Sequence, residues 1–250
     1  MVNAILRRFE LMSLNNSELP SGYKRLEFIA SANGAYIDSG LFGSNTLDFE
    51  MVAYSDLTSI QAFFGNRVRE GQQCYLLLYD KGNNFYQFDV DTSSQHFSKT
   101  NNVVASKKGN VLTLNDVSVT QKMNTFTTAQ HIYILGLNNN GGVKFNAKGI
   151  RIYSLKFSEN GTLIRDYIPA RRLSDNKVGM YDKVEGKFYT SAHDGYEFKG
   201  SDEYIKLVDL GLTSGTLWSD RNVGANKVID YGLHYAWGET DGYSDVNTDK

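Results

Sequence analysis

GIRIYSLKFSENGTLIRDYIPARR, residues Gly149–Arg172, is the stretch that decides the fold. It predicts one long β-hairpin, because two alternating arms flank Asn160-Gly161, a pair that supplies the two positive-φ residues of a type I′ turn. We expect Pro169 to end the second arm, since proline has no N–H for a ladder. In the first arm we place Ile150, Ile152, Ser154 and Lys156 on one face, and Arg151, Tyr153, Leu155 and Phe157 on the other.

The composition limits the class of protein. With 250 residues, 41% apolar and 13% aromatic, the chain can form one large β domain, or one domain and a smaller piece. The net charge is -2, and acidic and basic residues are interspersed. Because a nucleic-acid backbone requires clustered Lys and Arg, we expect no nucleic-acid partner.

The single cysteine, Cys74, excludes a disulfide within the chain and a cysteine-based zinc site. It lies in the apolar run CYLLLY, which predicts a buried free thiol. The four histidines contain no HExxH or HxH pair, so no metal motif is present. They are His96, His131, His193 and His234.

The N-terminal segment Val2–Leu14 predicts a short amphipathic helix. Such a helix is marginal alone in water, so it must pack on its own domain, on copies of itself in a symmetric oligomer, or on a partner in a larger assembly. Charged residues interrupt the apolar run that a secretory signal needs, so we expect no ordinary secretion. No stretch reaches the roughly 20 apolar residues of a membrane span. The apolar stripe, a candidate assembly anchor, consists of Val2, Ile5, Leu6, Phe9 and Met12.

From Leu19 onwards the hydrophobic pattern has a period of two. Many short strands with regular turn signals favour an antiparallel sandwich or barrel. A second hairpin, 178–191, is expected to turn at Glu185-Gly186, and the cluster Asn138–Gly142 is expected to be a turn. The other predicted strands are 24–31, 35–39, 46–54, 62–66, 73–80, 84–91, 96–100, 102–105, 111–114, 117–121 and 131–137.

Three segments carry a resemblance: LPSGYKRLEFIASANGAYIDSGL, IRIYSLKFSENGTLIRDYIPARR and GMYDKVEGKFYTS. Together they resemble the concanavalin A-like (laminin-G-like) jelly-roll domain of gut bacteriophage and Bacteroidales surface proteins. The resemblance covers Leu19 to about Gly200 and implies two antiparallel sheets packed face to face. It leaves the ligand open, because this fold serves sugar binding, adhesion and plain structure.

A second resemblance covers Val208–Thr240, VDLGLTSGTLWSDRNVGANKVIDYGLHYAWGET. It is similar to the start of a repeat domain of Bacteroidetes and Fibrobacter surface proteins, with Thr213 in place of the usual proline and Arg221 in place of the usual cysteine. The repeat normally continues well past Glu239. We therefore expect three parts: an anchor and linker over 1–18, a jelly roll over 19–200, and an incomplete surface-repeat module over 201–250.

The motifs of common enzymes are missing, and we expect no catalytic activity. A jelly-roll glycosidase needs two carboxylates about 5–10 Å apart, but the strand motif Glu-x-Asp-x-x-Glu does not occur. The nearest acidic pair is Asp89 and Asp91 in FDVDT. We interpret these as solvated residues at a strand end. Calcium is the one cofactor left open, with this pair as candidate ligands and Asp56 and Asp80 as further donors.

Sugar binding on a β-sandwich uses aromatic faces together with amide and carboxylate groups. The segment NNFYQFD provides the candidate glycan contacts Phe85, Tyr86, Gln87 and Phe88. At most half of them can be exposed, since one alternating face must be core. Four other tyrosines of the strands are expected to pack inside or to pair across strands. They are Tyr75, Tyr79, Tyr133 and Tyr153.

Two functions fit these expectations. The first is a structural bacteriophage virion protein, a head or tail fibre or capsid-decorating subunit. In that reading the N-terminal segment binds other virion proteins and the jelly roll meets host-surface glycans, in a homo-oligomer for which a trimer is favoured. The second is a lectin-like glycan-binding protein of the bacterial cell surface. The two place the chain in the virion and on the cell surface, respectively.

Overall fold

The computed structural model describes residues 19–31, 34–56, 58–69, 72–80, 82–90, 94–145, 147–201, 207–209 and 217–219. These residues form strands and no helix, which confirms the prediction of a mainly β protein. Leu19–Asp202 belong to one compact unit. Apart from it, β20 (Leu207–Asp209) and β21 (Leu217–Ser219) form a two-stranded antiparallel sheet. The predicted helix Val2–Leu14 lies outside the described residues, and the module predicted over 201–250 stays a prediction.

The first sheet has eleven strands. Its main path runs β11-β10-β9-β4-β15-β16-β17-β18, while β1 pairs with β16, β2 with β15, and β19 with β2. The strands are β1 (Tyr23–Arg25), β2 (Ile29–Ser31), β4 (Leu47–Ser55), β9 (Asn102–Lys108), β10 (Val111–Leu114), β11 (Val117–Thr120), β15 (Ile150–Glu159), β16 (Thr162–Arg172), β17 (Val178–Asp182), β18 (Lys187–Tyr189) and β19 (Phe198–Gly200).

The second sheet has eight strands. Its main path is β14-β13-β5-β6-β7-β8; β12 pairs with β5, and β3 pairs with β12. All described pairs are antiparallel except β13 with β5. The strands are β3 (Ile37–Ser44), β5 (Gln61–Arg67), β6 (Gln72–Asp80), β7 (Asn83–Val90), β8 (Ser94–Ser98), β12 (Thr127–Ile134), β13 (Leu137–Asn139) and β14 (Gly142–Lys144).

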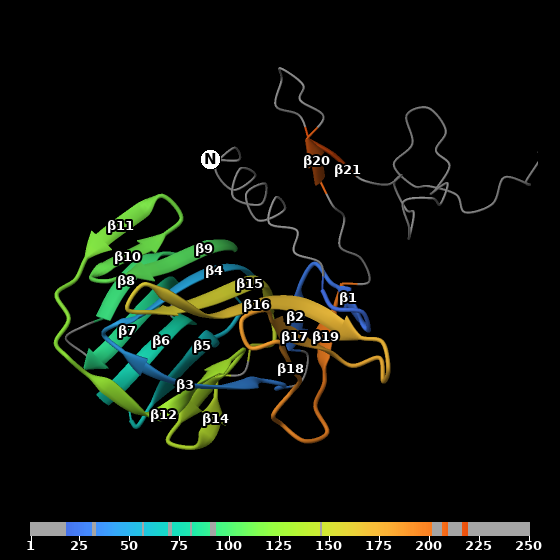
Figure 1. Ribbon diagram of the computed structural model, residues 1–250. Helices are drawn as coiled ribbons and strands as arrows, with labels where there is room; N and C mark the ends of the chain where they lie inside the picture. The colour runs from blue at the N-terminus through green and yellow to red at the C-terminus, as the bar shows by residue number, and fades with distance from the viewer. Residues whose placement is uncertain are drawn as a thin grey trace, which may run out of the picture. The chain divides into compact units, whose positions relative to one another are not determined.

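The two sheets share one hydrophobic core, as the layers in Figure 1 indicate. Phe49 on β4 meets Phe64 on β5 with ring centroids 4.8 Å apart, and Phe64 meets Phe157 on β15 at 5.7 Å. All three rings are buried, and such edge-to-face contacts add to the free energy gained by removing the rings from water. The described chain is therefore a β-sandwich. Cys74 is buried with a free thiol, as predicted.

The central hairpin forms as predicted at its tip. Asn160 and Gly161 have φ values of 49° and 78°, the two positive angles that a type I′ turn requires. Its first arm, β15, lies between β16 and β4 and pairs with β4 along its whole length. The hairpin is thus in the middle of the first sheet.

The predicted alternation of the first arm is wrong beyond Ile152. The register with β4 shifts between Ile152 and Ser154, so Tyr153 is the extra residue of a β-bulge. The bulge changes which alternate residues face the core. The fully buried apolar residues of the arm are Ile150, Ile152, Leu155 and Phe157.

Pro169 does not end the second arm, because β16 continues to Arg172. Pro169 lies between Tyr167, which pairs with β15, and Ala170, which pairs with β1. The Pro169 carbonyl accepts a hydrogen bond from Leu26 N at 3.0 Å. The N–H and C=O groups of one strand residue point to the same side of the strand. The N–H that Pro169 lacks would therefore point to the side where β16 stops pairing with β15 and starts pairing with β1, so no ladder hydrogen bond is lost there.

Two other turns bear on the predictions. Gly186 has a φ of 67° between β17 and β18, which confirms the second hairpin. The cluster Asn138–Gly142 is more than a turn, because β13 and β14 pair across it. Asn140 and Gly141 have φ values of 53° and 87°, so this Asn-Gly pair also makes a tight hairpin.

Candidate functional site

The glycan contacts predicted in β7 are contradicted for three of the four residues. Tyr86 and Phe88 are fully buried, and Gln87 is 3% exposed. β7 lies between β6 and β8, and an apolar cluster that includes Leu76 and Leu78 covers the other face of the neighbouring strand β6. With both faces of this part of the sheet covered, these side chains cannot stack on a sugar. Phe85 pairs through its backbone with Leu78, and its glycan contact stays a prediction.

The calcium prediction is not decided by the described residues. Asp89 lies in β7 and pairs through its backbone with Cys74, whereas Asp91 lies outside the described residues. Within the described ranges, no group of three or more His, Cys, Asp or Glu side chains could hold a metal ion.

Asp56, one of the predicted calcium donors, accepts the hydrogen bonds that hold the connection between β4 and β5. Its Oδ1 accepts hydrogen bonds from Thr58 N at 3.1 Å, Thr58 Oγ1 at 3.0 Å and Gln61 Nε2 at 2.8 Å. Gln61 Oε1 in turn accepts from Gly149 N at 2.8 Å. Burial favours the neutral carboxyl, but the hydrogen bonds from Gln61 and Thr58 more than offset it and hold the pKa of Asp56 below 3.8.

Replacing Asp56 by asparagine should remove one pH-dependent part of the stability. A lowered folded-state pKa stabilises the protein above 3.8, and this contribution is lost as the pH falls through the folded pKa. The contribution is at most about 1 kcal/mol, because the carboxylate is exposed. Urea unfolding between pH 6 and pH 2 should therefore show a smaller loss for Asp56→Asn than for the wild type. The control is Asp116→Asn, a change at an exposed turn. If all three proteins lost the same free energy of unfolding on acidification, the lowered pKa of Asp56 would be contradicted.

A row of neighbouring aromatic rings lies at the edge of the second sheet, and we call it the aromatic row: Tyr133, Tyr36, His193 and Tyr196. Tyr133 on β12 lies opposite Asp38 on β3, so Tyr36 is its diagonal neighbour. The rings of Tyr36 and Tyr133 stack at 4.3 Å with an interplanar angle of 22°. Tyr36 then meets His193 at 5.9 Å, and His193 stacks on Tyr196 at 4.0 Å and 25°.

The turn His193–Tyr196 brings the last two rings together. Tyr196 N donates to His193 O at 3.1 Å, and Gly195, third in the turn, has a φ of 77°. Positive φ at that position is typical of a type II turn, which favours glycine there. Residues three apart across such a turn lie close together, so the sequence HDGY places the imidazole against the phenol.

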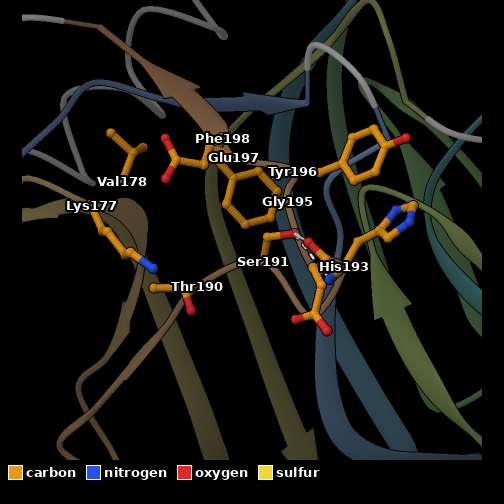
Figure 2. Close-up of a pocket in the computed structure, with 10 residues that line it drawn as sticks. Lys177, Val178, Thr190, Ser191, His193, Gly195, Tyr196, Glu197 and Phe198 are labelled. Atoms are coloured by element: carbon orange, nitrogen blue, oxygen red, sulfur yellow. Dashed lines mark hydrogen bonds between the residues drawn. The ribbon is translucent and has the colours of Figure 1, made fainter.

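The segment before the turn is hydrogen-bonded to residues 34–36, which directly precede β3. Ala192 N donates to Tyr36 O at 2.8 Å, and His193 Nδ1 lies 3.1 Å from Gly34 O. A carbonyl can only accept, so Nδ1 carries the proton and Nε2 is left as an acceptor in the neutral ring. The Ser191 hydroxyl accepts from His193 N at 3.1 Å and donates to His193 O at 3.2 Å (Figure 2).

The aromatic row ends at a pocket of about 300 Å³, which we call the end pocket. Its lining residues come from the start of β17, the segment after β18 and the loop before β19, and Figure 2 shows the rings of His193 and Tyr196 pointing away from Lys177 and Thr190. His193 and Tyr196 belong both to the row and to the pocket. The other residues that line it are Lys177, Val178, Thr190, Ser191, Asp194, Gly195, Glu197 and Phe198.

At the other end, Asp38, His131 and Phe42 form an exposed polar and aromatic group. The register between β3 and β12 shifts between His131 and Tyr133, and this irregularity brings Asp38 Oδ1 to 3.1 Å from His131 Nδ1. The two side chains are 38% and 40% exposed. Phe42 pairs with His131, packs edge-on against its ring at 4.6 Å, and is 47% exposed.

The row is buried at its Tyr133 end and exposed at its Tyr196 end. Burial, together with the neighbouring Tyr36 and Asp38, raises the pKa of Tyr133 to about 12, so its hydroxyl stays protonated at neutral pH. Tyr133 is 8% exposed, whereas Tyr196 is 38% exposed. Tyr133 stacks on Tyr36 and His193 stacks on Tyr196, so the exposed ring that a ligand can meet is that of Tyr196. The arrangement suits the binding of a ligand that has both an apolar face and hydroxyl groups.

Sequence reasoning missed this surface. Its rings come from three segments far apart in the chain, near Tyr36, near Tyr133 and around His193, and the β3–β12 pairing together with the hydrogen bonds from Ala192 and His193 brings them together. The one local signal was Asp194-Gly195, a turn pair flanked by two rings.

Neither a scan against models of protein families nor a search of curated proteins found a match to this chain. Among the described residues, no helix is long and apolar enough to cross a membrane.

Proposed function

We propose that this chain is a non-enzymatic attachment and display protein of a bacteriophage virion, a head or tail fibre or capsid-decorating subunit. Its sandwich would be a concanavalin A-like jelly roll that contacts host-surface glycans. The observation that supports the proposal is the aromatic row, which leads from the buried Tyr133 to the exposed ring of Tyr196 beside the end pocket. The two sequence resemblances, to a phage-type jelly roll and to a surface repeat, support the same proposal.

The alternative is a glycan-binding protein of the bacterial cell surface, which would use the same row and pocket. The two proposals differ in location, so antibodies against the chain distinguish them. Labelling of purified phage particles supports the virion protein. Labelling of uninfected bacterial cells, with none on particles, supports the alternative and overturns the virion assignment.

The remaining parts of the proposal concern assembly. The N-terminal segment would bind other virion proteins, and the protein would be a homo-oligomer, with a trimer favoured because fibres commonly use threefold symmetry. The mass of the full chain in solution, measured by light scattering, tests the oligomer directly.

Attachment to glycans can be tested on intact cells. The labelled full chain should bind gut Bacteroidales cells, and periodate oxidation of the cell surface should abolish binding, because periodate cleaves the vicinal diols of sugars. Binding that survives periodate and is instead removed by protease treatment of the cells would contradict a glycan receptor.

A further inference from the structure

We propose that the free edge of β11 is a contact between two copies of this chain, in which their β11 strands pair antiparallel about a twofold axis. The first sheet of one copy would then continue into the first sheet of the other. The inference goes beyond the proposed function and does not rest on it, because a twofold contact is distinct from the threefold assembly favoured there.

The backbone of β11 offers hydrogen bonds on one side. β11 is the last strand at its end of the first sheet, and among the described strands only β10 pairs with it (Figure 1). On the β10 side, Gln121 N donates to Asn110 O at 2.8 Å. Because successive residues of a strand direct their N–H and C=O groups to alternate sides, Ser118 and Thr120 direct theirs to the free edge. These groups can pair with a further strand.

The strand lacks the features that usually prevent such pairing. Its sequence, VSVT, contains β-branched residues and neither proline nor a charged residue. Val117 lies opposite the buried Leu114 and so shares its face, yet it is 58% exposed. Val119, on the same face, is partly buried against the core. The apolar face of the sheet therefore extends to its edge, where a partner strand would shield it from water.

The flanking charges select one register. Ser118 and Thr120 carry the free backbone groups, so a close twofold pairing sets them opposite each other or sets one of them opposite itself. Asp116 comes one residue before β11, and Lys122 comes two residues after it. When Ser118 lies opposite the partner's Thr120, Asp116 lies opposite the partner's Lys122, and the twofold axis repeats this pair. In the other two registers neither charge meets its opposite.

Both charges are available for this contact. Asp116 and Lys122 are exposed, and within the described ranges neither forms an ion pair within 4.0 Å. An exposed ion pair contributes little free energy, so these charges specify the alignment. The backbone hydrogen bonds and the shielded valines would hold the strands together, as in other cases of strand addition.

Disulfide trapping in the full chain tests the contact. In the proposed register Val119 lies opposite the partner's Val119 in a non-hydrogen-bonded pair. The Cα atoms of such a pair are about 4.5 Å apart, within the roughly 4.4–6.8 Å that a disulfide spans. Mild oxidation of Val119→Cys with copper phenanthroline should therefore give a disulfide-linked dimer on a non-reducing gel. The wild type should give none, since its single cysteine, Cys74, is buried.

Val117→Cys is the matched control for random collision. Val117 is 58% exposed, so collision alone would cross-link this position more readily than the partly buried Val119. In the proposed register the two copies of residue 117 are four residues out of alignment, about 14 Å at roughly 3.4 Å per residue, which is too far for a disulfide. We expect little dimer from Val117→Cys. Dimer yields as high as those of Val119→Cys would overturn the pairing.

Charge reversal tests the register itself. In the Val119→Cys background, Asp116→Lys or Lys122→Asp sets like charges opposite each other, and either change should lower the dimer yield several-fold. The double variant exchanges the two charges and should restore the yield. Circular dichroism spectra like that of the wild type would show that each variant is folded. Single reversals without effect, or a double variant that stays low, would overturn the register.

The outcomes are separable from those of the proposed function. If Val119→Cys gave no dimer while the chain bound cells in a periodate-sensitive manner, the contact at β11 would be overturned and the proposed function would stand. If the dimer formed in the expected register while the chain failed to bind cells, the contact would be supported and glycan attachment would be contradicted.

Discussion

Alanine at position 43 is expected to destabilise the sandwich by about 3 kcal/mol, because it overfills a packed core. A Cβ added to Gly43 would overlap Cβ and Cγ of Tyr75. Those atoms are close to the Tyr75 backbone, so the ring cannot swing away. Its hydroxyl donates to Leu47 O at 2.8 Å, and its ring packs against Phe88 at 4.9 Å, both within the core. Urea unfolding of Gly43→Ala should show a lower midpoint with an unchanged slope.

Gly142→Ala is the matched control for this effect. Its added Cβ would meet only Asn139 O, at 3.7 Å, which is an ordinary contact. Its unfolding midpoint should lie close to that of the wild type. If Gly43→Ala were as stable as Gly142→Ala, the packing of β3 against Tyr75 would be wrong.

Methionine in place of Lys107 should also cost about 3 kcal/mol. The Lys107 side chain is fully buried, and its Nζ donates to Asn45 O, Leu47 O and Asp48 Oδ1 at 2.8, 2.8 and 2.9 Å. Methionine keeps the stem but removes the ammonium from all three acceptors, of which Leu47 O keeps the Tyr75 hydroxyl and Asp48 Oδ1 keeps Gly109 N as donors. Removing one partner of a buried pair commonly costs about 3–5 kcal/mol; the lower end applies because Asp48 is 25% exposed.

The neighbouring Lys108 provides the control. It is 67% exposed and pairs with Glu50 at 2.5 Å, so Lys108→Met should change the stability by less than about 1 kcal/mol. If Lys107→Met and Lys108→Met lost similar free energies of unfolding, the burial of Lys107 would be contradicted.

The Lys107 effect should also depend on pH. Burial lowers the pKa of Lys107 below 10.5, although Asp48 opposes the shift. Between the folded pKa and 10.5 the unfolded chain binds more protons, so the wild type gains stability as the pH rises through this window. Lys107→Met lacks this gain. The difference in the free energy of unfolding between the wild type and Lys107→Met should therefore widen as the pH approaches 10.5.

The sequence predicts those parts of the fold that depend on neighbouring residues alone, namely the turns and the positions of the strands. Asn160-Gly161 specifies its turn through the backbone angles of those two residues, and period-two alternation located most strands within a few residues. The bulge at Tyr153 and the position of Pro169 depend on where β15 and β16 change neighbours. Pairing between distant segments decides that, and a single sequence does not show it.

The candidate site was less predictable for the same reason. Tyr86 and Phe88 have the composition of a sugar platform, yet they lie in an inner strand and face the core. Tyr36 and His193 carry no pattern in the sequence that links them. Their contact requires β12, β3 and the loop before β19 to be in place together.

Attachment of the full chain to intact gut Bacteroidales cells, measured side by side for the wild type, Tyr196→Ala and Leu163→Ala, tests the central claim most directly. Leu163 is 41% exposed and lies on β16, outside the end pocket, so Leu163→Ala controls for a general change of surface. We expect Tyr196→Ala to attach about tenfold more weakly than the other two proteins, which should attach equally. Equal attachment of all three proteins would contradict it.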